Sequence, residues 1–260
     1  MSTKSNHHNK ILAGTFLIFL CVFNVSAIAQ GQAFNEKDSD AKAIKIANDV
    51  MQAIGGKKNW DATHFIAWNF FGSRKLIWDK YTGNVRIENL KNDTKILVNI
   101  NNSKGKVYKD GAELTQPDSL AKYLEEGRKI WINDSYWLLM PFKMQDPGVT
   151  LKYIGEDTTQ KGTKADVVRL TYKGVGVTPN NAFNVWVSKQ TKLVDQWAFY
   201  KEANQPKPGF VLTWEDYQTY GKIKLSSLRG ERKISDLHVF NKLPESVFTS
   251  FTPVDLSKFK

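Results

Sequence analysis

Two histidines are the first residues to consider for chemistry in the chain after residue 29. His64 and His238 each lie in a segment whose alternating pattern predicts a strand, and Asp61 and Asp236 are near them in sequence. Neither spacing matches a metal-binding motif or a general base with its orienting acid. We therefore interpret both histidines as structural or surface residues.

Other catalytic patterns are equally weak. The chain after residue 29 has no Gly-x-Ser-x-Gly elbow, Walker loop or Gly-x-Gly-x-x-Gly turn, and Gly174-Val175-Gly176-Val177 precedes a strand rather than a phosphate-binding helix. Two acids distant in sequence can meet in space, so Glu125-Glu126, Glu215-Asp216 and Asp79 keep open the hypothesis of a hydrolase. The sequence favours a protein that is not an enzyme, with no catalytic residue, metal site or cofactor.

Aromatic residues give the positive signal. The chain has 8 Trp, 9 Tyr and 15 Phe, many of them in segments with strand alternation. Bulky side chains on the concave side of a large curved sheet can line an apolar cavity. Alternation selects as the predicted lining Ile66, Trp68, Phe70, Leu76, Trp78, Trp197 and Phe199.

Two helices and two sets of strands must position these residues. Apolar spacings of three and four predict helices over 41–55 and 117–139, and Pro141 stops the second. Period-two segments bounded by turn residues predict strands at 63–71, 73–80, 83–88, 95–99, 105–109, 149–154, 165–172, 182–187, 193–200, 211–217, 223–229 and 237–240. We expect one large antiparallel sheet of about eleven strands with a few inserted helices.

The N-terminal 29 residues have the pattern of a cleavable secretory signal peptide. Lys4 and Lys10 precede an apolar run from Ile11 to Val25, and small residues lead to a cut after Ala29. Residues 30–260 are then expected to form a single domain. The sole cysteine, Cys21, lies inside the apolar run without the small residues that precede a lipidated cysteine. The mature protein is therefore expected to be unlipidated and free of thiols.

Charge gives a weaker indication of partners. Cleavage removes Lys4 and Lys10 and no acid, so the net charge falls by two, from +11 to +9. The basic residues are scattered, with no run longer than two, which argues against a nucleic-acid groove. Transient contact with an anionic membrane surface fits this charge better, as does a solvated surface with no partner.

The order of segments resembles the LolA/LolB-like lipoprotein-carrier superfamily, in particular a poorly characterised branch of outer-membrane lipoprotein-sorting proteins. The residues that carry the resemblance are Tyr136–Phe142, Val149–Gly155, Ala182–Phe199 and Phe248–Pro253. The resemblance implies a mainly β (α+β) fold, an unclosed antiparallel β-barrel of about eleven strands with helices forming a lid over a hydrophobic cavity. It also implies an arginine on an early strand that latches the lid, for which Arg74 and Arg86 are candidates.

These observations lead to one main hypothesis and two alternatives. The main one is a monomeric periplasmic carrier that holds an acyl chain, lipid or lipoprotein, with helices 41–55 and 117–139 as its lid. The second is an envelope-stress or regulatory protein that uses the same fold to bind a partner. The third is the hydrolase with a hidden carboxylate pair.

Overall fold

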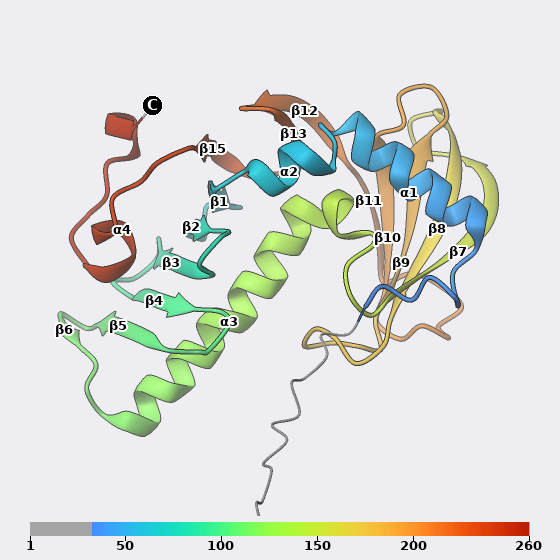
Figure 1. Cartoon of the computed structure of the whole chain (residues 1–260). Coiled ribbons are helices and arrows are strands. Elements are labelled where there is room, and N and C mark those ends of the chain that lie inside the picture. The colour runs from blue at the N-terminus through green and yellow to red at the C-terminus, as the bar shows by residue number, and fades with distance from the viewer. Residues whose placement is uncertain (1–32, 260) are drawn as a thin grey trace, which may run out of the picture. The chain divides into compact units, whose positions relative to one another are not determined.

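Strands dominate residues 33–259, the part of the chain that the computed structural model describes (Figure 1). The predicted signal peptide and Cys21 lie outside these residues. The helices are α1 (Ala41–Ala53), α2 (Lys57–Ala62), α3 (Pro117–Leu139) and α4 (Ser246–Thr249), with 3₁₀ turns η1 (Met140–Lys143) and η2 (Leu256–Phe259). The first helix thus ends close to its predicted boundary, and α3 runs without a break.

The strands form three antiparallel sheets. The first has the order β15-β1-β2-β3-β4-β5-β6, the second β11-β10-β9-β8-β7 and the third β12-β13-β14. The strands of the first sheet are β1 (Phe65–Phe70), β2 (Arg74–Asp79), β3 (Asn84–Asn89), β4 (Lys95–Asn99), β5 (Gly105–Lys109), β6 (Ala112–Glu113) and β15 (Ser235–Phe240). Those of the second are β7 (Val149–Thr158), β8 (Lys164–Tyr172), β9 (Ala182–Ser188), β10 (Val194–Tyr200) and β11 (Phe210–Thr213). Those of the third are β12 (Glu215–Tyr220), β13 (Ile223–Arg229) and β14 (Arg232–Lys233).

The mainly β, antiparallel class is confirmed, but the expected single sheet is wrong. The predicted strand 211–217 is broken at the buried Trp214, so β11 stays in the second sheet while β12 enters the third. Asp216, with φ 57°, follows this break in a left-handed conformation that Asp tolerates better than most residues. Residues 33–259 contain no closed barrel, and the fold does not confirm the count of eleven strands.

Helix α3 packs on the inner face of the first sheet, mainly against β4 and β5. Gly127 allows this close approach, because a Cβ at that position would lie 2.8 Å from Cγ2 of Ile96. The inner face contributes an alternating set of buried residues: Ile66, Trp68, Phe70, Leu76, Trp78, Val85, Ile87, Ile96 and Val98. The helix predicted as a lid is thus part of the core along much of its length, and the helical lid is not confirmed.

Helix α1 covers part of the second sheet, where it contacts β7 and β8. Its buried face consists of Ala43, Ile46, Ala47 and Val50. Asp40 at its N-terminus accepts a 2.9 Å hydrogen bond from the backbone N–H of Tyr153 on β7. These contacts fix the helix against the strands beside it.

The C-terminal end of α3 is held by an arginine from the third sheet. Pro141 has no N–H, so the carbonyl of Trp137 four residues earlier lacks its usual helical partner. Arg229 on β13 replaces that partner, donating to this carbonyl from Nε at 3.0 Å and from Nη2 at 2.7 Å. Its guanidinium also lies 3.3 Å from the ring centroid of Trp214. Helix α3 thus ends just before Pro141, as expected. Arg229 links its last turn to β13, and no pattern in the sequence indicates this link.

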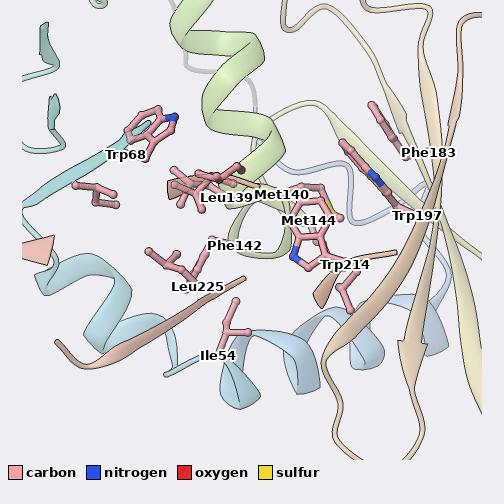
Figure 2. Close-up of a cluster of buried hydrophobic side chains, with 14 of the residues drawn as sticks. Ile54, Trp68, Leu139, Met140, Phe142, Met144, Phe183, Trp197, Trp214 and Leu225 are labelled. Carbon is pink, nitrogen blue, oxygen red and sulfur yellow. The ribbon is translucent and has the colours of Figure 1, made fainter. Parts of the chain in front are cut away.

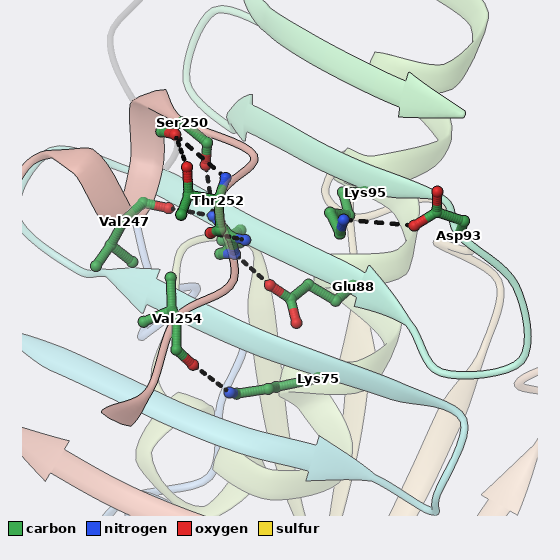
Figure 3. Close-up of polar contacts among 9 residues, drawn as sticks. Lys75, Glu88, Asp93, Lys95, Val247, Ser250, Thr252 and Val254 are labelled. Carbon is green, nitrogen blue, oxygen red and sulfur yellow. Dashed lines mark hydrogen bonds and ion pairs between the residues drawn. The ribbon is translucent and has the colours of Figure 1, made fainter. Parts of the chain in front are cut away.

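The C-terminal segment covers the outer face of the first sheet. An apolar cluster joins that face to α4 and η2, with buried members Phe65, Ala67, Ile77, Phe240, Leu243, Val247 and Leu256. Arg86, which is 0 % exposed, donates to the carbonyls of Val247, Ser250 and Thr252 at 3.1, 2.6 and 2.9 Å. In Figure 3 dashed lines mark these hydrogen bonds, the ion pair that ends on Glu88, and the hydrogen bond from Lys75 to the carbonyl of Val254.

Residues 33–259 belong to one compact unit. The boundary between a signal peptide and a mature domain stays a prediction. No helix within residues 33–259 is long and apolar enough to cross a membrane.

Candidate binding cavity

A cavity of about 560 Å³ lies between the last turns of α3 and the inner face of the second sheet. The segments 143–149 and 175–181 complete its wall. Its aromatic lining consists of Trp131, Tyr136, Trp137, Tyr172, Phe183, Trp197, Phe199 and Phe210. The volume falls in the range of about 300 to 1,000 Å³ that small-molecule sites occupy.

Strand pairing brings the aromatic rings of the sheet together. Trp197 and Phe199 are two residues apart on β10 and so point to the same face, and Phe199 pairs with Phe183 on β9. Figure 2 shows the rings of Trp197 and Phe183 side by side. Their centroids are 5.1 Å apart in a stacked arrangement, and Phe199 stacks on Phe210 at 5.1 Å. The sheet thus supplies a continuous aromatic wall.

Helix α3 supplies the facing wall through two consecutive residues. Trp137 meets Trp197 edge-on at 4.9 Å and stacks on Phe210 at 5.5 Å. Tyr136 lies 5.1 Å from the ring of Phe183. Because Arg229 fixes the carbonyl of Trp137, the third sheet helps to set the position of this wall.

Polar groups gather where α3 and η1 meet β8. The hydroxyl of Tyr136 on α3 is hydrogen-bonded to that of Tyr172 on β8, and Lys143 is paired with Asp146 nearby. Burial raises the pKa of both tyrosines above the ordinary value, and the negative charge of Asp146 acts in the same direction. Both hydroxyls therefore stay protonated at neutral pH.

The predicted cavity residues divide into two groups. Trp197 and Phe199 line the cavity, as their strand alternation suggests. The other five pack in the core without lining it: Ile66, Trp68, Phe70, Leu76 and Trp78. They face α3, which packs on the inner face of the first sheet where the sequence predicts a cavity.

The remaining aromatic lining residues were missed for three reasons. Tyr136, Trp137 and Trp131 belong to a helix, whereas the prediction considered strands only. Phe183 and Phe210 do lie on strands, and their register beside Phe199 could have been proposed from pairing neighbouring strands. Tyr172 ends a predicted strand, but Tyr136, to which its hydroxyl is hydrogen-bonded, is 36 residues away, so no local pattern indicates that the two lie together.

The two candidate latch arginines make different contacts. Arg86 holds the C-terminal segment, as described above. Arg74 at the start of β2 forms a two-bond ion pair with Asp134 on α3, with Nε–Oδ2 and Nη2–Oδ1 distances of 2.8 and 3.0 Å. Asp134 is 0 % exposed, and burial raises the pKa of its carboxyl while the hydrogen bonds from Arg74 lower it. Of the two arginines, Arg74 is thus the one that holds α3.

Replacing Arg74 by Met should destabilise the fold in a pH-dependent way. Without the guanidinium, burial raises the pKa of Asp134 further above its unfolded value. When folding raises the pKa of an acid, the protein loses stability as the pH rises from the unfolded pKa of that acid to its folded pKa. The variant should therefore approach wild type near pH 3.5 and lose about 2 kcal/mol at pH 7, as measured by urea unfolding. Arg128→Met, which removes an ion pair with Glu125 on the same helix, is the control and should change little; equal losses for both variants would contradict the prediction.

His64 is paired with Asp79 at 3.1 Å and stacks on Phe65 and Tyr81. Within residues 33–259 there is no group of three or more His, Cys, Asp or Glu side chains that could hold a metal ion.

Comparison with known proteins gives structural likenesses only. No protein-family model matches the chain, and no curated protein matches it. A DUF1329 family protein from Desulfovibrio piger is similar in structure, with 12 % identity, a TM-score of 0.43, and coverage of 84 % of this chain and 99 % of that one. A LolA superfamily protein from Nitrosomonas europaea is similar with 11 % identity, a TM-score of 0.36, and coverage of 80 % and 97 %.

A LolA superfamily protein is thus among the solved structures to which the chain is similar. Likenesses of this size carry no information on ligand or activity. The proposed function therefore rests on the cavity and its lining residues.

Proposed function

We propose that the protein is a periplasmic carrier that binds the acyl chain of a lipid or lipoprotein in the aromatic cavity. The observation that carries this proposal is the cavity of about 560 Å³ walled by eight aromatic residues. The carrier acts through binding, with no chemical step and no cofactor.

The physical driving force is the removal of the ligand's alkyl chain from water. Each buried CH₂ group contributes about 0.8 kcal/mol. Trp197 is 1 % exposed and packs against Trp137 and Phe210, so an alkyl chain would lie along the partly exposed rings of Trp137, Phe199 and Phe210. A preformed wall also reduces the ordering cost of binding.

Delivery to a membrane surface is the step in which the basic surface would act. The net positive charge of the mature chain attracts anionic headgroups weakly and reversibly. A monomer with transient membrane contact is the simplest arrangement consistent with carriage.

A charge placed in the cavity should abolish binding of an apolar probe. The variant Phe199→Glu introduces a carboxylate where the ligand chain would lie, and Phe199 is only half-buried, so the fold should tolerate it. We expect the Kd for N-phenyl-1-naphthylamine, measured by fluorescence titration, to rise at least about tenfold, because one factor of ten is about 1.4 kcal/mol.

The control is Ile154→Glu, which adds the same charge at an exposed apolar residue on β7 outside the cavity. It should bind the probe as wild type does. A wild-type protein that takes up no probe, and yields no lipid by mass spectrometry when purified from its host, would refute the proposed function. Capture of a protein partner without lipid dependence would favour the regulatory alternative.

A further inference from the structure

The paired hydroxyls of Tyr136 and Tyr172 have an unused hydrogen-bond donor. Two hydroxyls carry two protons, and only one proton lies between the two oxygens. Neither hydroxyl makes another hydrogen bond with the described residues. The hydroxyl that accepts therefore keeps its own proton for a further acceptor.

Other buried donors in the cavity wall are in the same condition. The indole Nε1 atoms of Trp131 and Trp197 are buried and have no hydrogen-bond partner within the described part of the chain. A buried donor without an acceptor costs about 1 to 3 kcal/mol. Because Trp68, Trp78 and Trp214 outside the cavity also have Nε1 atoms unpaired within residues 33–259, the tyrosine pair alone marks a place for a ligand acceptor.

The nearby charges are already balanced. Lys143 and Asp146 neutralise each other beside the tyrosine pair, so an added full charge in the ligand would have no free counter-charge there. An uncharged acceptor fits this surrounding better than a carboxylate or an ammonium group.

We propose that the Tyr136–Tyr172 pair recognises the carbonyl oxygen of a neutral acyl ester or amide whose alkyl chain lies against Phe199 and Phe210. This inference rests on the proposed function and adds the chemical class of the ligand. Glycerolipids supply the ester and N-acylated proteins supply the amide, and both present the same carbonyl acceptor. Burial raises the pKa of both tyrosines, which keeps the donor available across the neutral range.

The pair predicts an unusual mutational pattern. If Tyr136 is replaced by Phe, the hydroxyl of Tyr172 loses its partner but keeps its proton, and the reverse replacement does the same. Each single variant therefore retains a donor for the ligand. Only Tyr136→Phe/Tyr172→Phe removes the donor completely. The effects of the two single replacements on ligand binding should therefore not add up to the effect of the double variant.

The experiment uses the full chain and two probes labelled with ¹³C at the carbonyl, methyl laurate and N-methyl lauramide. Isotope-edited infrared spectroscopy reports whether the bound carbonyl accepts a hydrogen bond, since such a bond lowers its stretching frequency. We expect the lowered frequency in wild type and both single variants, and a frequency typical of hydrocarbon solvent in the double variant. The Kd of both probes should rise about tenfold in the double variant only.

The controls separate this proposal from the proposed function. Tyr153→Phe removes a hydroxyl that bonds to Asp166 outside the cavity, and it should behave as wild type. N-phenyl-1-naphthylamine has no carbonyl, so its Kd should rise less in the double variant than the Kd of the labelled probes. If the double variant still binds the labelled probes and the bound carbonyl keeps its lowered frequency, the tyrosine pair is not the site although the carrier function stands. If wild type binds neither N-phenyl-1-naphthylamine nor the labelled probes, both proposals fail. If the bound carbonyl frequency is lowered for only one of the two labelled probes, the ligand is limited to an ester or to an amide accordingly.

Discussion

Arg229→Met is expected to lower the free energy of unfolding by about 3 kcal/mol at neutral pH. The guanidinium donates to the carbonyls of Trp137, Ser226 and Leu228 and to Oγ of Ser226. Burial lowers the pKa of Arg229 to about 9, so its burial as a cation has a cost that Met would relieve. The orphaned carbonyls and the lost contact with the ring of Trp214 outweigh that relief, because Pro141 leaves the carbonyl of Trp137 without a helical donor.

Urea unfolding provides the measurement, and Arg232→Met, at an exposed arginine three residues further on, provides the control. Arg229→Lys should restore only part of the stability, since an ammonium group cannot donate along the same directions as the guanidinium fork. Because Trp137 lines the cavity, Arg229→Met should also weaken probe binding. Stability within about 0.5 kcal/mol of wild type would show that the cross-link between β13 and α3 is dispensable.

Arg86→Met is expected to free the C-terminal segment from the first sheet. Three carbonyls of residues 247–252 would lose a buried donor, and Glu88 would lose its 2.5 Å partner. We expect a loss of about 3 kcal/mol in the free energy of unfolding and faster amide exchange throughout residues 244–259. The outer face beneath this segment, including Phe65 and Ile77, would then become exposed.

Lys106→Met is the matched control for Arg86→Met. Lys106 lies on the same outer face, opposite Leu97, but its side chain is exposed. It should leave both stability and exchange unchanged. Exchange in residues 244–259 that stays at the wild-type rate in Arg86→Met would mean that the apolar contacts alone hold the segment.

Local patterns in the sequence predicted the strands well because alternation and turn residues act over a few positions. Segments such as 95–99 and 105–109 match β4 and β5. The division into three sheets escaped prediction, since it depends on a break at Trp214 inside an otherwise continuous strand pattern. No periodic pattern in the sequence shows where the chain leaves one sheet and enters the next.

The candidate site was predicted only in part, for a related reason. Trp197 and Phe199 follow from strand alternation, but Trp137 and Tyr136 reach the cavity because α3 crosses from one sheet toward the other. The ion pair between Arg74 and Asp134 joins residues 60 positions apart. Contacts of this kind depend on tertiary packing, which a single sequence does not encode in any local pattern.

The pairing of β1 with β15 has a consequence for the order in which the chain can fold. Phe65 lies opposite Phe240, so the edge of the first sheet is completed by one of the last segments to be synthesised. Closing so long a loop is entropically costly and slows folding. Until residue 240 is available, β1 has an open edge, so the first sheet cannot be completed before the segment that carries β15 has been synthesised.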